Sequence, residues 1–266
     1  MPARTGSPVP EPEDSELMGR ILWGQHYRFL PSKPALRVLA GLCADGLPTL
    51  AVFKDRACEA AEAVGLSLAE KDRTLGKKFG EKFSTSFPEP EEKSRRRYRD
   101  QYLAYVRPTD GKVDGLLSRL KFIKIMAEGG THKVGITKSG LDFAVLQNPV
   151  LDGAGNGSLL SDQEADFLIR HIRARIPEEA RHMDMMLRLI GEGVASRERL
   201  NSRMGEFYRA YQDVDNPWTP AHVNTMRAGL LSRLYELGLV DKTKHGLNVT
   251  YWLTERGKKC QSSLRQ

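Results

Sequence analysis

Carboxylates, histidines and cysteines are the residues of this chain that could carry catalysis or hold a metal. The stretch FPEPEEK at 87–93 sets carboxylates close to a lysine, as a nuclease acidic site does. Its carboxylates are too closely spaced for such a site, no apolar strand flanks them, and its prolines predict a loop. The six histidines form no HExxH pair and have no metal-ligand spacing with the cysteines. Neither a GxxxxGK phosphate loop nor a GxSxG nucleophile elbow is present. The sequence therefore predicts a binding protein that is not an enzyme and uses no metal or cofactor.

The cysteines and the lack of long apolar runs indicate a compartment. Cys43, Cys58 and Cys260 form no paired framework and no CxxC motif, and the first two lie in apolar helical contexts that predict buried thiols. No apolar run approaches the roughly 20 residues that span a bilayer. The Pro-rich, acidic start of the chain has no apolar core for secretion. We therefore expect a reduced, cytoplasmic protein with no membrane partner.

Positive charge is the main signal in the composition. The formal net charge is +7 and the isoelectric point is about 9.3, which favours a polyanionic partner. We expect the densest basic run, at 93–99, to contact phosphates. The alternative interpretation is a solvated run balanced by the glutamates at 89, 91 and 92. The basic residues of this run are Lys93, Arg95, Arg96, Arg97 and Arg99.

The hexapeptide GLLSRL occurs at 115–120 and again at 229–234, an offset of 114 residues. Each copy precedes a short apolar strand, a polar loop, a second strand and a threonine that begins a helix, Thr137 or Thr254. Because Gly257 follows Gly140 by 117 residues, we expect the second loop to be three residues longer. Upstream, a Gly-containing turn between two helices repeats at an offset of 147. Because this offset exceeds the offset of 114 between the hexapeptides by 33, we expect an insertion of 33 residues in the first copy, at about 60–98.

The repeated order of helix, turn, helix, helix, strand, loop and strand resembles the winged helix-turn-helix family over about 19–146 and 180–263. GLLSRLYELGLVDK with YWLTERG, and GLLSRLKFIKI with KVGITKSG, match its recognition helix, strand, wing and strand. The resemblance implies a mainly α fold with small β wings (α+β), in two winged units joined by a bridging helix. We expect a disordered tail at 1–16, a first winged unit at 17–147, a linker with the bridging helix at 148–178, and a second winged unit at 179–266. Ser161 and Glu164 predict a capping box at the start of the bridging helix.

The helix predicted at 220–237 begins with Thr219 as its N-cap and Pro220 as its first residue. Apolar residues at 223, 226, 230, 234 and 237 form a stripe that should pack inward. The opposite face is small and polar with arginines on its flanks, which suits a helix in the DNA major groove. An ordinary solvated helix face is the alternative. Its candidate DNA contacts are Asn224, Thr225, Arg227, Ser232 and Arg233.

The corresponding helix of the first copy is shorter and is the weaker candidate. Asp110 and Asp114 on its outward face would repel phosphate, so this winged unit would instead serve a structural or protein-contact role. Its candidate contacts are Lys112, Ser118, Arg119 and Lys121. The wings, at 127–133 and 242–245, place cations on hairpins that suit contact with a nucleic-acid backbone. Their candidates are His132, Lys133, Lys242, Lys244 and His245, and lysines that serve only solubility are the alternative.

These observations lead to an expectation of double-stranded DNA binding, in transcription control, replication initiation or a restriction or phage-defence system. The order of the units is also similar to the recognition half of type IIS restriction endonucleases, in which case a partner chain would supply the nuclease. The alternative is a protein-interaction subunit of a larger complex such as a chromosome-organising ATPase, which the two aspartates favour. Binding of single strands or RNA is a third hypothesis, and it requires exposed aromatic platforms.

Overall fold

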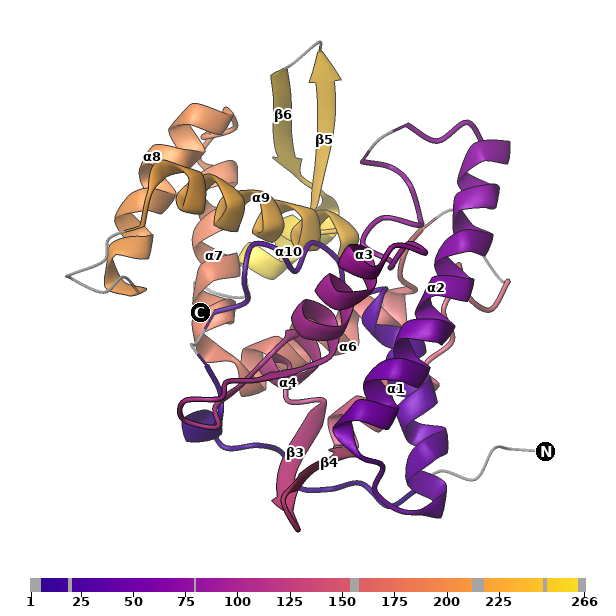
Figure 1. Cartoon of the computed structure of the whole chain (residues 1–266). Helices are drawn as coiled ribbons and strands as arrows, with labels where there is room; N and C mark the ends of the chain where they lie inside the picture. The colour runs from indigo at the N-terminus through magenta and orange to yellow at the C-terminus, as the bar shows by residue number, and fades with distance from the viewer. Residues whose placement is uncertain are drawn as a thin grey trace. The chain divides into compact units, whose positions relative to one another are not determined.

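A computed structural model of the chain describes residues 6–18, 21–78, 80–153, 158–211, 218–245 and 248–262. The chain is mainly α-helical with small antiparallel hairpins, as the sequence predicts (Figure 1). It divides into two compact units. Unit 1 comprises Met1–Arg20 and Phe29–Phe167, and unit 2 comprises Ile21–Arg28 and Leu168–Gln266. Across the described ranges, no helix is both long and apolar enough to cross a membrane.

Unit 1 packs helix α1 (Ser32–Leu42) against the long helix α2 (Leu50–Thr74). The predicted burial of Cys43 and Cys58 in this region is confirmed, and burial raises the pKa of both thiols. Short 3-10 helices, η1 (Asp14–Glu16) and η2 (Cys43–Asp45), precede α2. After α2 follow α3 (Glu92–Arg97), the π-helical turn η3 (Tyr98–Leu103), strands β1 (Tyr105–Val106) and β2 (Val113–Asp114), α4 (Leu116–Arg119), the hairpin of β3 (Ile123–Glu128) and β4 (Thr131–Ile136), and α5 (Lys138–Val145).

Unit 2 has the same kind of organisation without the long insertion. Helix α6 (Asp162–Arg175) begins in unit 1 and ends in unit 2. It is followed by α7 (Pro177–Gly191), α8 (Arg197–Tyr208), η4 (Arg209–Tyr211), α9 (Pro220–Glu236), the hairpin of β5 (Val240–His245) and β6 (Asn248–Leu253), and α10 (Glu255–Ser262). Leu200 and Met204 of α8 and Leu230 and Leu234 of α9 are fully buried and form part of its core.

The repeat is real, but the two GLLSRL copies are out of register. The Thr137 hydroxyl donates to the carbonyl of residue 121 at 2.8 Å, and the Thr254 hydroxyl donates to that of residue 238 at 2.6 Å. The amide of Phe122 donates to Leu117 O at 3.0 Å, as that of Leu239 donates to Leu234 O at 2.9 Å. All these pairs are related by 117 residues, whereas the hexapeptides are related by 114. The identical letters therefore lie about one helical turn apart in the two copies.

The hairpins themselves correct the expected difference in loop length. Ile123 pairs with Ile136 and Val240 pairs with Leu253, and in each hairpin two residues of the chain separate two six-residue strands. The expectation of a longer second loop is therefore wrong. Upstream, the offset of 147 is confirmed, because the N-caps Thr49 and Ser196 both accept from an amide three residues later. The insertion in the first copy thus has 30 residues instead of 33, and helix α2 extends to Thr74, within the range 60–98 that the sequence assigns to the insertion.

The N-terminal segment is ordered over its described part, where the sequence predicts a disordered tail. Val9 N donates to Ile136 O at 2.8 Å, and Met18 N donates to Val113 O at 2.8 Å. These backbone bonds hold residues 9–18 along unit 1, which is why a Pro-rich segment with little apolar content is fixed there. Residues 1–5 lie outside the described residues.

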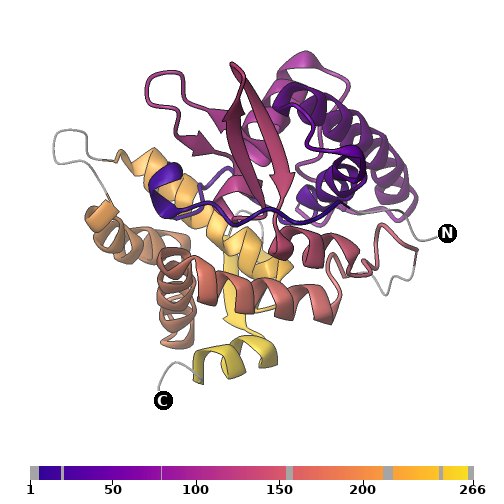
Figure 2. The same ribbon diagram turned by 90° about the horizontal axis from the view of Figure 1, so that it is seen from below.

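Residues 21–28 belong to unit 2, although the sequence places them in the first winged unit. The Leu22 amide donates to Glu179 Oε2 of α7 at 3.0 Å, and the Gly24 amide donates to Met226 Sδ of α9 at 3.0 Å. A Cβ atom at Gly24 would lie 2.3 Å from the carbonyl oxygen of Thr225, so only glycine permits this approach. Figure 2 shows the indigo segment beside the orange helix α9. The segment therefore packs directly on α9.

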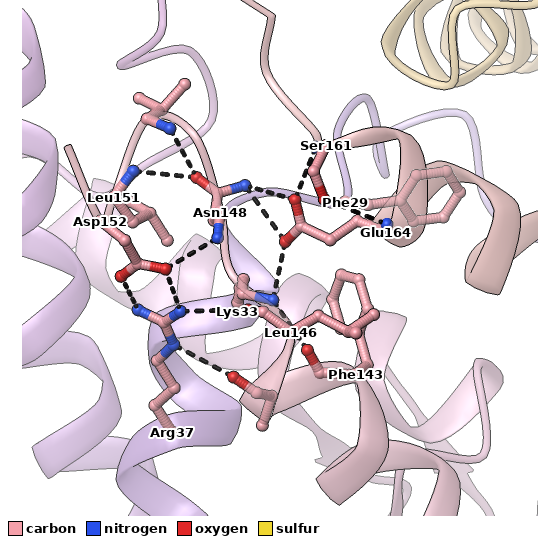
Figure 3. A network of polar contacts seen from close by, with 12 residues as sticks. Phe29, Lys33, Arg37, Phe143, Leu146, Asn148, Leu151, Asp152, Ser161 and Glu164 are labelled. Atoms are coloured by element: carbon pink, nitrogen blue, oxygen red, sulfur yellow. Dashed lines mark hydrogen bonds and ion pairs between the residues drawn. The ribbon is translucent and has the colours of Figure 1, made fainter. Parts of the chain in front are cut away.

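A buried polar network fixes the start of α6 to unit 1 (Figure 3). Lys33 Nζ lies 2.7 Å from Glu164 Oε1 and donates to Phe143 O at 2.7 Å, and both charged side chains are fully buried. Asn148 Nδ2 donates to Glu164 Oε2 at 2.9 Å. The predicted capping box is confirmed, because the Ser161 amide donates to Glu164 Oε2 and the Glu164 amide donates to Ser161 Oγ. Residues expected to form a linker therefore pack as part of unit 1.

Candidate nucleic-acid interface

Helix α9 forms as the sequence predicts. Thr219 Oγ1 accepts from the His222 amide at 3.3 Å, and Pro220 is the first helical residue. The stripe residues Met226, Leu230, Leu234 and Leu237 are buried. On the opposite face Ala221 is exposed, and the other small and polar residues are half-buried: Asn224, Thr225, Ala228, Ser232 and Tyr235. The helix therefore presents short side chains to solvent beside its apolar stripe.

Two arginines converge on Asn224 where α8 meets α9. Arg197 donates to Asn224 Oδ1 from Nε at 3.2 Å and from Nη2 at 3.1 Å. Arg227 donates to the same oxygen from Nη2 at 2.9 Å, and its Nε donates to Asn201 Oδ1 at 2.6 Å. Tyr251 of strand β6 also hydrogen-bonds to Arg227. We call Arg197, Asn201, Asn224, Arg227 and Tyr251 the arginine cluster.

The electrostatics of the arginine cluster are unusual. Within the described ranges, neither Arg197 nor Arg227 pairs with a carboxylate. Burial lowers the pKa of Arg227, and the neighbouring charge of Arg197 lowers it further, although Tyr251 opposes this change. Burial likewise raises the pKa of Tyr251. Two positive charges therefore lie together, and no carboxylate among the described residues neutralises them.

The hairpin of unit 2 carries its cations on one face. Lys242 and Lys244 alternate along β5, so their side chains point to the same side. The Lys242 ammonium lies 4.5 Å from the centroid of the Tyr235 ring, which joins the hairpin to α9, and Lys244 is exposed. The side chain of His245, a further candidate, lies outside the described residues.

Arg233 is the main correction on α9. Its side chain is only 1% exposed. It pairs with Glu179 at 2.8 Å and donates to the carbonyl oxygens of Trp23 and His26 at 3.1 and 2.8 Å. Because the segment 21–28 and α7 cover this flank of the helix, Arg233 holds unit 2 together and is unavailable to a ligand.

The candidates next to α4 are also engaged within unit 1. Ser118 is buried instead of outward-facing, and Arg119 is buried in an ion pair with Asp114. Lys121 pairs with Asp14 of the N-terminal segment at 2.7 Å. Helix α4 has only four residues, since Gly115 at φ 110° ends any continuation toward its N-terminus. The expected recognition helix of the first copy is therefore absent from this described stretch.

The remaining unit 1 candidates are more open. Lys112 and His132 are exposed, and Lys133 is half-buried on β4 beside the Gly129-Gly130 turn. Asp110 is exposed and pairs with Arg107, and Asp114 is half-buried and pairs with Arg119. Both aspartates that the sequence predicts would repel phosphate are thus paired with arginines of unit 1.

The basic run at 93–99 divides into two groups. Arg95 pairs with Glu62 at 2.6 Å, and Arg99 pairs with Asp55 and Glu92 at 3.3 and 3.2 Å. These two arginines fix α3 and η3 to α2. The others are exposed, share one side of α3, and pair with no carboxylate in the part of the chain that the structure describes: Lys93, Arg96 and Arg97.

Sequence reasoning missed Arg197, Asn201 and Tyr251. A signal for the first was present, because the offset of 147 makes Ser196 an N-cap and so puts Arg197 in the first turn of α8. Its convergence with Arg227 depends on how α8 and α9 pack, which no local pattern specifies. Comparison with known proteins adds no assignment: no protein-family model, curated protein or solved structure matches the chain significantly.

Proposed function

We propose that this protein binds double-stranded DNA through unit 2, without catalysing a reaction. The observation that carries the proposal is the open face of α9, with Ala221, Thr225 and Ala228 exposed or half-buried next to a hairpin that bears Lys242 and Lys244. Short side chains let a helix approach base edges in the major groove, which is wide enough for an α-helix. Cations on the adjacent hairpin suit phosphate contact.

The overall arrangement supports a winged helix-turn-helix type of interaction. Helices α7, α8 and α9 precede the β5–β6 hairpin, which is the order in which that family places its helices before its wing (Figure 1). The net charge of +7 favours a polyanion. Such a protein would serve as a regulator, a replication initiator or the DNA-recognition subunit of a defence system in the cytoplasm.

The alternative of a protein-interaction subunit loses the observation that favoured it. Asp110 and Asp114 pair with Arg107 and Arg119, so each carboxylate has an arginine partner within unit 1. Unit 1 then contributes to DNA binding through the exposed group of Lys93, Arg96 and Arg97. A protein partner that supplies nuclease or ATPase activity remains compatible with this proposal.

Fluorescence anisotropy with labelled random-sequence duplex and single strands, over a salt series, tests the proposal. We expect the wild type to prefer the duplex, with an affinity that falls steeply as salt rises. Changing Lys242 and Lys244 together to Ala should reduce the slope of log K against log salt by about two. The same charge change at Lys258 and Lys259 on α10 is the matched control. Absence of binding to either nucleic acid at low salt would overturn the proposal.

A further inference from the structure

Arg197 and Arg227 share an amide partner, whereas the buried arginines Arg119 and Arg233 each have a carboxylate partner. The buried Arg119 and Arg233 pair with Asp114 and Glu179. In the arginine cluster, by contrast, the shared acceptor is the uncharged Oδ1 atom of Asn224. An amide oxygen orients the two guanidinium groups, but it leaves both charges uncompensated.

The two arginines differ in their access to solvent. The Arg227 side chain is fixed between Asn201 and Asn224 and is 5% exposed, whereas Arg197 is exposed. A ligand can therefore reach Arg197 from solvent while Arg227 provides a second positive charge from behind. Placing two like charges close together in a half-buried position is unfavourable until an anion neutralises them.

We propose that the arginine cluster is a binding site for one phosphate group. Guanidinium groups suit this ligand because their planar N–H donors match the oxygen geometry of a phosphate. The identification of that phosphate as part of a DNA backbone rests on the proposed function. Asn224 is then a positioning residue that holds the two arginines, in contrast to the sequence expectation that it contacts DNA itself.

The Asn224→Asp variant separates this role from a purely structural one. An aspartate places a carboxylate between the two arginines, so it should raise the thermal midpoint of unit 2 and occupy the phosphate site from within. Duplex affinity at about 0.1 M salt should fall on the order of tenfold, and the salt slope should fall by about one. A folding defect would instead lower the thermal midpoint and the affinity together.

Arg197→Ala should cause a similar loss of affinity. Arg199→Ala is its matched control, because this exposed arginine lies on α8 about 200° around the helix from Arg197. We expect the control to change affinity by less than about twofold. The loss in Arg197→Ala should be equal on two duplexes of unrelated sequence, since phosphates carry no sequence information. A loss confined to one sequence would overturn the proposal.

Inorganic phosphate tests the site without DNA. At constant ionic strength, replacing chloride with phosphate should raise the thermal midpoint of the wild type more than that of Arg197→Ala. If the wild type binds no DNA but shows this selective stabilisation, the proposed function fails and the phosphate site stands. If the wild type binds DNA and Arg197→Ala and Asn224→Asp behave like Arg199→Ala, the site is refuted and the proposed function stands.

Discussion

Acid should destabilise unit 2 through the buried carboxylate of Glu179. This side chain is fully buried and accepts from Arg233 at 2.8 Å, from the Leu22 amide at 3.0 Å and from His182 Nδ1 at 3.2 Å. Burial alone would raise its pKa, but Arg233, His182 and the Leu22 amide together lower it to about 2. Burial lowers the pKa of His182, so the imidazole is neutral and its Nε2 lies 2.6 Å from the Tyr208 hydroxyl.

The direction and size of the loss of stability in acid follow from the lowered pKa values of Glu179 and His182. Glu179 has a lower pKa in the folded protein than its ordinary value of 4.5, so its contribution is complete above pH 4.5 and is lost as the pH falls toward 2. At about 1.4 kcal/mol per pH unit, this contribution is roughly 3 kcal/mol. His182 acts in the same direction, because the unfolded imidazole takes up a proton below its ordinary pKa of 6.5 before the buried one does. Stability should therefore decline from about pH 6.5 downward.

Tryptophan fluorescence provides a selective assay, because Trp23, Trp218 and Trp252 all belong to unit 2. Urea unfolding at pH 7.5, 5.5 and 4 should show the decline. Glu179→Gln should lower the free energy of unfolding at pH 7.5 by about 3–5 kcal/mol, since it leaves Arg233 buried without its carboxylate. The same variant should also flatten the pH dependence of the free energy of unfolding below pH 4.5. The exposed Glu198→Gln on α8 is the matched control, and an unchanged acid profile in Glu179→Gln would refute the reasoning.

Two further expectations concern unit 1. Gly140→Ala should destabilise it by about 1–3 kcal/mol or more, because the new Cβ would lie 2.1 Å from the carbonyl oxygen of Phe122; Gly41→Ala, within α1 and with no atom within 4 Å, should stabilise it by about 0.5–1 kcal/mol. Thermal denaturation followed by circular dichroism compares the two, and an equal response would contradict the close approach at residue 140. Asp14→Asn should release Lys121 and increase the salt slope of duplex binding by up to about one. An unchanged slope would mean that this lysine lies away from the bound DNA.

Local patterns predict the elements whose causes are local. The Thr219 cap, the stripe from Met226 to Leu237 and both hairpins depend on residues a few positions apart, so periodicity and capping rules find them. The fold class and the face of α9 follow from the same rules. Sequence identity alone is a weaker guide to structural equivalence, because the two GLLSRL copies lie one helical turn apart in the two units and make different contacts.

The errors at individual residues have one physical origin. Helical spacing gives a direction around the helix axis, but it does not reveal which distant segment covers that direction. Helical spacing places Arg233 on the flank of an open face, but residues 21–28 pack on it; the same spacing leaves Lys121 open, but Asp14 pairs with it. The contact of Arg197 with Asn224 escaped prediction for the same reason, because the two residues belong to helices whose packing decides their distance.

The membership of residues 21–28 in unit 2 has a consequence for synthesis on the ribosome. Gly24 and its partner Met226 are 202 residues apart in the chain. At elongation rates of about 5–20 residues per second, the segment emerges roughly 10–40 s before the helix that receives it. During this interval Ile21 and Leu22 have no unit 2 core to enter, so a nascent chain that pauses after residue 167 exposes an apolar segment to chaperones, and unit 2 can complete its folding only after α9 has emerged.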